Sequence, residues 1–329
     1  MMNAAPMPSK TPSGLSRIRV ASVLFAAAGA ALGQTPPADV RSLVDGARLG
    51  TGYAQMIGLA ATPDVSAANY DIDAAGSEPT LDVFRLPYQA RWMTLSPDAD
   101  LYWKVAGGWL RLEDDFRFGV PPAADATIGS RWTAYSASGG LLAKVRLDGG
   151  FTLEPALDVS VARLENRASY SGAASALQPL FDGTLFNWQS NAWLVTPSLG
   201  LEWATTIDDA KATVRGHVAR SWISSFDETD PVLSFSEATN GYSIRADYAR
   251  PTGHRLADRP LSWVVYGGFA GFFGANRDAL GFDSVAEVGG GIELPLVADQ
   301  PKAERLRLAA GYLFGPDVRG WTLGLSLRY

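Results

Sequence analysis

The chain has 329 residues and a net charge of −6, with 47% hydrophobic, 19% charged and 11% aromatic residues. It has no cysteine and only two histidines, which excludes a disulfide framework, a cysteine-based metal site and a thiol nucleophile. Charges of both signs are interspersed, so we expect no nucleic-acid partner, and no motif calls for a cofactor or a metal.

The N-terminal segment has the order of features that marks an export signal. Lys10, Arg17 and Arg19 precede an apolar run over 20–32, which ends in small residues. That run is too short to cross a bilayer as a helix. We therefore predict a secretory signal over 1–33, and the rest of the chain has no apolar stretch long enough for a helical span.

The segment 34–65 differs from everything after it. Val40, Val44 and Ala47, followed by Ile57 and Ala60, lie at roughly helical spacing, although several glycines weaken a helix. Two interpretations stay open. The segment is either a helix that plugs the interior of the downstream domain or a lead-in on the periplasmic side.

The remainder of the chain, 66–329, is patterned with a period of two, as β-strands are. At the C-terminus one face carries only apolar or aromatic residues: Trp321, Leu323, Leu325, Leu327 and Tyr329. A second apolar face runs from Trp193 to Trp203. Ten residues of strand span roughly 33 Å, or about 25 Å of height at a tilt of about 40°, which is the apolar band of an outer-membrane barrel between two aromatic girdles.

These patterns predict an all-β fold, a closed antiparallel transmembrane β-barrel of about twelve strands. Counting from a periplasmic C-terminus, the longest external loops are 113–130, 164–190 and 224–240, and the turn at 251–260 is long for a periplasmic one. The aromatic residues of loop 164–190 suit either a binding surface or a loop that folds over the mouth. The strands are expected near 66–73, 80–92, 100–112, 131–147, 151–163, 191–205, 211–223, 241–250, 261–273, 283–296, 304–314 and 320–329.

The polar faces of these strands place many charges inside the barrel. An unpaired charge in a narrow lumen is unfavourable, so we expect a paired structural network; a selective pore with a mild preference for anions is the alternative. The residues expected in this lumen are Lys104, Lys144, Arg146, Glu154, Asp158, Glu202, Arg215, His217, Arg245, Asp247, Glu287, Glu293, Arg305, Arg307 and Arg328.

A lipid hydrolase, either a phospholipase or a lipid-A deacylase, is the alternative from another functional class. Such an enzyme needs a serine activated by a nearby histidine. His217 and Ser221 share a strand face but lie roughly 13 Å apart, and His254 lies in a turn. We therefore expect no catalytic residues and assign both histidines a structural role.

The export signal, the short helical segment, the twelve strands and the Leu323–Leu325–Leu327–Tyr329 ending together resemble the autotransporter translocator barrels, in particular the solitary type without a passenger. The resemblance covers about 40–329. It implies a barrel in the outer membrane of a Gram-negative bacterium, in contact with lipid and lipopolysaccharide. It also implies that the C-terminal strand addresses the chain to the barrel-assembly machinery. The 30 or so residues before the barrel are too few for a passenger. We expect a monomer with a structural or interaction role, or a narrow pore.

Overall fold

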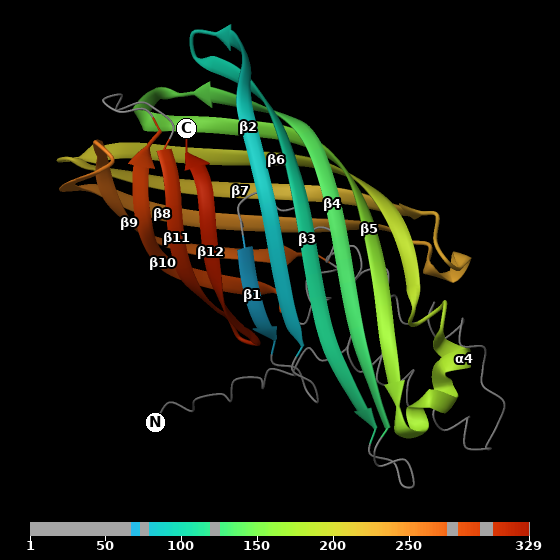
Figure 1. The fold of residues 1–329 in the computed structure, drawn as a ribbon. Coiled ribbons are helices and arrows are strands. Elements are labelled where there is room, and N and C mark those ends of the chain that lie inside the picture. Colours follow the sequence, from blue (N-terminus) through green and yellow to red (C-terminus); the bar gives the residue numbers. More distant parts are fainter. Residues whose placement is uncertain (1–66, 73–78, 119–125, 275–281, 297–304, 329) are drawn as a thin grey trace, which may run out of the picture.

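The computed structural model describes residues 67–72, 79–118, 126–274, 282–296 and 305–328. They form one closed barrel in which each strand pairs antiparallel with its neighbours in sequence and β1 pairs with β12 (Figure 1). The predicted twelve-stranded antiparallel barrel is confirmed. Its strands are β1 (Ala67–Ile72), β2 (Thr80–Ser96), β3 (Ala99–Phe118), β4 (Ala126–Arg146), β5 (Phe151–Ser171), β6 (Trp188–Ile207), β7 (Ala210–Phe226), β8 (Ser236–Leu256), β9 (Arg259–Phe273), β10 (Ser284–Pro295), β11 (Arg305–Phe314) and β12 (Val318–Arg328).

Three parts of the predicted organisation lie outside the described residues: the signal over 1–33, the segment 34–65 and the terminal Tyr329. No helix in the described ranges is long and apolar enough to cross a membrane.

The period of two in the sequence becomes two faces of the barrel wall. On β6, Trp193 and Leu199 are 44% and 46% exposed, whereas Leu194 between them is fully buried. Successive side chains of a strand point to opposite faces, so the exposed set points outward and the buried set points into the lumen. The same holds on β12, where Trp321 and Leu325 are exposed and Thr322 is buried. An exterior this apolar is matched to lipid.

Outward aromatic side chains gather near both ends of the wall. Phe151 and Trp263 lie near the end with the short turns, where Tyr88 also packs against Trp103 with ring centroids 5.4 Å apart. Toward the opposite end the outward aromatics include Tyr135, Trp193, Trp222, Phe273, Tyr312 and Trp321. Two such girdles mark the two interfaces of a membrane-spanning barrel.

Strands extend further than the sequence pattern indicates, and this corrects the predicted loops. The predicted loop 113–130 is largely strand, because β3 runs to Phe118 and β4 begins at Ala126. The loops 164–190 and 224–240 shrink in the same way to 172–187 and 227–235, and the turn at 251–260 shrinks to Ala257 and Asp258. Beyond the lipid band the outward residues need not be apolar, so apolar alternation ends before the hydrogen-bonded ladder does.

Candidate functional site: the barrel lumen

The lumen contains a cavity of about 590 Å³ whose wall carries charges of both signs. Thirteen of the fifteen residues predicted for the lumen line this cavity. Of the other two, Arg146 lies elsewhere, and the side chain of Arg328 is outside the described set. The thirteen are Lys104, Lys144, Glu154, Asp158, Glu202, Arg215, His217, Arg245, Asp247, Glu287, Glu293, Arg305 and Arg307.

The charges from β3 to β7 form one set of ion pairs. Lys104 Nζ lies 2.6 Å from a carboxylate oxygen of Asp158. Glu154 is shared, because Lys144 Nζ approaches it at 3.5 Å and Arg215 Nε at 3.7 Å. Arg215 also donates to Glu202, so the contacts around Glu154 join the four adjacent strands β4 to β7, and the Lys104–Asp158 pair adds β3.

The charges from β8 to β11 form a second and more deeply buried set. Arg307 donates from Nε to Glu293 at 2.7 Å and also binds Asp247. The side chains of these three residues are only 5–9% exposed. Arg305 adds a longer contact of 3.7 Å to Glu293, and Arg245 contacts Asp247 at 3.3 Å. Buried charges that are paired and hydrogen-bonded offset much of the penalty for leaving water, so these groups form a network within the wall.

Glycines make room for these contacts. Gly140 lies between Lys104 and Asp158 in the register of β3, β4 and β5. A Cβ at Gly140 would come within 2.3 Å of the Asp158 carboxylate, so any other residue would obstruct the ion pair. Gly311 acts similarly beside Tyr266, whose hydroxyl donates to Glu287 at 3.0 Å and whose ring lies 3.8 Å from the Arg245 guanidinium. These strand glycines thus allow close approach of charged side chains.

Arg146 lies at the turn end of the barrel, apart from the two sets. Its guanidinium donates to Asp100 at 2.8 Å, and the Arg146 side chain is half exposed. Asp100 also accepts from the Thr94 hydroxyl at 2.9 Å. Sequence reasoning missed Asp100, because its partner is 46 residues away and only the pairing of β3 with β4 brings them together.

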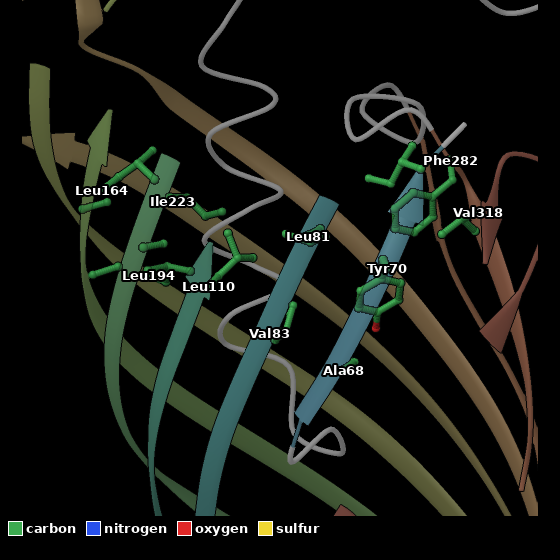
Figure 2. Close-up of a cluster of buried hydrophobic side chains, with 14 of the residues drawn as sticks. Ala68, Tyr70, Leu81, Val83, Leu110, Leu164, Leu194, Ile223, Phe282 and Val318 are labelled. Atoms are coloured by element: carbon green, nitrogen blue, oxygen red, sulfur yellow. The ribbon is translucent and has the colours of Figure 1, made fainter. Parts of the chain in front are cut away.

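The half of the lumen nearer the external loops has an apolar wall, which the sequence did not indicate. Val83, Leu110, Ala134 and Leu164 lie opposite one another in the register of β2 to β5, and all four are buried. Leu194 and Ile223 lie opposite each other on β6 and β7, four residues off this row, and belong to the same buried cluster. Figure 2 shows these side chains pointing inward from neighbouring strands, with Tyr70 and Phe282 stacked nearby. We call this set the inner apolar wall.

Between β5 and β6 the chain folds into a small cap with its own core. It contains the short helices η2 (Gly172–Leu177) and α4 (Gln178–Phe181). Phe181 and Phe186 are fully buried and meet edge to face with centroids 6.1 Å apart. Buried rings of this kind give the cap internal stability and leave little aromatic surface for a partner.

The polar side of the cap is organised around Asp182. Its carboxylate accepts hydrogen bonds from the Tyr170 hydroxyl at 3.0 Å and from Asn187 Nδ2 at 2.6 Å. Tyr170 lies well beyond the girdle near Trp193, outside the lipid band. Burial raises the pKa of Tyr170 above its ordinary value, and its bond to Asp182 raises the pKa further.

The two histidines lie in different parts of the barrel. His217 lines the lumen cavity, with Ser243 directly opposite it on β8. The Ser221 hydroxyl is 2.8 Å from the Thr196 hydroxyl. His254 is exposed near the β8–β9 turn. Within the described ranges no three His, Asp or Glu side chains are grouped as a metal site would require.

A closed antiparallel barrel with an apolar exterior, two aromatic girdles and a lumen rich in ion pairs defines the class of transmembrane outer-membrane β-barrels. A family model described as the solitary outer membrane autotransporter beta-barrel domain matches residues 64–288. Because the match covers more than half of the chain, the protein belongs to this family, and the predicted resemblance is confirmed.

Solved structures of autotransporter domains are similar to this chain at low sequence identity. The translocator domain of the autotransporter NalP from Neisseria meningitidis is 9% identical, with a TM-score of 0.50, over 86% of this chain and 96% of that one. The transport unit of the autotransporter AIDA-I from Escherichia coli is 11% identical, with a TM-score of 0.49, over 85% and 98%. The beta domain of the Bordetella autotransporter BrkA is 13% identical, with a TM-score of 0.47, over 80% and 95%. A comparison with curated proteins gave no match.

Family membership fixes the location of the protein. It is an autotransporter-type barrel embedded in the outer membrane of a Gram-negative bacterium and inserted there by the barrel-assembly machinery. The family is defined by a barrel that stands alone, in agreement with the passenger-less architecture expected from the sequence.

Proposed function

We propose that this solitary barrel has a structural or interaction role at the cell surface, and that its lumen is closed to free diffusion and carries no catalytic site. The observation that carries the proposal is the inner apolar wall. Leu110, Leu164 and Leu194 point inward and yet are no more than 1% exposed. Inward side chains of a water-filled channel would be both polar and accessible, as porin interiors are.

The charged half of the lumen supports the same role. Arg307 is matched by Glu293 and Asp247, and Lys104 by Asp158. Charges held by one another at short distances are poorly suited to attract a passing ion, whereas they fix the register of neighbouring strands. The alternative is a narrow pore. The cavity of about 590 Å³ favours a pore, and the small excess of cations on its wall would make such a pore selective for anions.

We infer that residues 1–33 are a signal removed on export and that 34–65 fill part of the lumen as a helical plug. The argument is complementarity: Val40, Val44 and Ile57 would offer an apolar stripe to the inner apolar wall. The barrel proper, 66–329, would then be a monomer. Its C-terminal strand, with Trp321, would serve as the address for assembly, and its outer face would contact lipid and lipopolysaccharide.

Planar-bilayer recordings test the closed lumen. We expect the mature full chain to give no steady conductance, because the inner apolar wall, the paired charges and the segment 34–65 would together leave no wet path. A variant lacking 34–65 should conduct if that segment is the plug. Silence of both proteins would support closure by the barrel's own residues and contradict the plug. Steady, anion-selective conductance of the full chain would overturn the proposal in favour of the pore.

A hydrolase assay tests the alternative that the protein is a lipid hydrolase. Protein refolded in detergent should leave phospholipid and lipid A intact, because His217 faces the lumen and the Ser221 hydroxyl is engaged by Thr196. Hydrolysis abolished by His217→Ala would contradict this.

A further inference from the structure

A group of charged side chains lies on the outer face of the wall, beyond the apolar band. It comprises Arg111 and Glu113 of β3, Arg131 of β4, and Arg163, Glu165 and Arg167 of β5, and we call it the outer basic patch. Alternation places these residues outward, because Leu110 and Leu164, next to Arg111 and Arg163, are buried inside.

The register fixes the height of the patch. Arg163 lies directly opposite Tyr135, an outward aromatic of the external girdle, and opposite Asn191, two residues from Trp193. Arg131 and Arg167 lie four residues further out along β4 and β5. The patch therefore begins where the lipid acyl chains end. It spans three strands and the four-residue step from Arg163 to Arg167, about 10 Å by about 13 Å, comparable to a disaccharide.

The charge of the patch is positive, with four guanidinium groups and two carboxylates. Each carboxylate is shared by two arginines: Glu113 lies 2.5 Å from Arg111 and 2.6 Å from Arg131, and Glu165 lies 2.7 Å from Arg163 and 3.4 Å from Arg167. Two positive charges remain within these six residues, next to the exposed carboxylate of Asp115 on the same face of β3, on a chain whose overall charge is −6. The side chains of Arg131 and Arg167 are 54% and 80% exposed, so the donors that Glu113 and Glu165 do not use remain accessible there.

One feature of the patch points to an anion. Arg131 and Arg167 lie directly opposite each other in the register of β4 and β5. Like charges in that position are destabilising on a sheet. Glu113 and Glu165 each offset one of these charges, and an anion between the two guanidinium groups would offset the repulsion further. A phosphate accepts hydrogen bonds from two guanidinium groups at once, and arginine suits that geometry.

We propose that the outer basic patch binds the phosphorylated disaccharide of a lipopolysaccharide molecule in the outer leaflet, with one phosphate between Arg131 and Arg167. Lipopolysaccharide is the lipid of that leaflet, and its phosphates lie at the boundary between the acyl chains and the sugars. Its acyl chains would lie along the apolar wall below, against Tyr135 and Trp193. This site rests on the proposed contact with lipopolysaccharide and is independent of whether the lumen conducts.

The test compares the binding of purified lipopolysaccharide, by titration in detergent, to the parent chain and to R131Q/R167Q. We expect about ten-fold weaker binding by the double variant, because two charge-assisted contacts to phosphate are lost. The matched control is R250Q, which removes an exposed arginine paired with Asp209 by the opposite end of the barrel; it should bind as the parent does. Enzymatically dephosphorylated lipopolysaccharide should bind the parent as weakly as intact lipopolysaccharide binds the double variant.

Other results would overturn the proposal in distinguishable ways. Equal binding by the parent and R131Q/R167Q would remove this site while leaving the lipopolysaccharide contact in place. No binding by the parent would remove both. Equally tight binding of phosphatidylglycerol vesicles would show general attraction to anions in place of a lipopolysaccharide site. The double variant relieves a like-charge contact, so it should fold as well as the parent, which migration of the unheated protein on a denaturing gel can verify.

Discussion

Replacing Arg307 by Met is expected to lower the free energy of unfolding by about 3–5 kcal/mol. The guanidinium of Arg307 is nearly inaccessible and binds both Glu293 and Asp247. Without it, two buried carboxylates would face each other, and only the longer contacts of Arg245 and Arg305 would supply counter-charge. The measurement is denaturant-induced unfolding in lipid vesicles, followed by the fluorescence of the ten tryptophans.

Two further variants separate this effect from the loss of any arginine. Arg250→Met removes a pair whose side chains are 50% and 55% exposed, so it should change stability by about 1 kcal/mol or less. The triple variant R307M/D247L/E293M removes all three charges and should recover most of the loss, because apolar groups of similar size can replace a buried ion network. Equal destabilisation by Arg307→Met and Arg250→Met would contradict the account of a buried network.

The second large effect is expected on the lipid face. Leu199 is 46% exposed and lies between Trp193 and Trp203 on β6, near the middle of the apolar band. Leu199→Arg should destabilise the membrane-inserted barrel by about 2–4 kcal/mol, since a charge there enters hydrocarbon. Folding into vesicles over a urea series measures the change.

Ile207 provides the matched control for that prediction. It is 54% exposed, similar to Leu199, but it ends β6 beside the turn outside the girdle. Ile207→Arg should therefore have an effect of about 1 kcal/mol or less. If both variants were tolerated alike, β6 would not cross a lipid band.

The barrel itself could be predicted because its physical cause is local. Lipid outside and water or polar partners inside impose alternation on every strand, so Leu323 and Leu325 on β12 reveal the fold without any knowledge of their neighbours. Barrel closure then follows, because an open sheet edge is not tolerated in hydrocarbon.

The ion pairs and the inner apolar wall depend on information that one strand does not contain. Which carboxylate Arg307 meets is set by the register of β8, β10 and β11, over up to 60 residues of sequence. The inward Leu194 and the outward Trp193 are both apolar, so hydropathy alone does not separate them. The strand extensions that carry Glu113 and Arg167 were missed for a related reason: above the lipid band the outer face becomes polar and the alternation in hydropathy disappears.

The orientation of side chains along β6 tests the central claim most directly. The chain has no cysteine, so single cysteines over 192–203 can each carry a spin label without a background. In vesicles, labels at 193, 195, 199 and 201 should be accessible to dissolved oxygen, and labels at 192, 194 and 198 should be shielded, with a period of two. A uniform profile, or a period near 3.6, would contradict a barrel wall with lipid on one side and a filled lumen on the other.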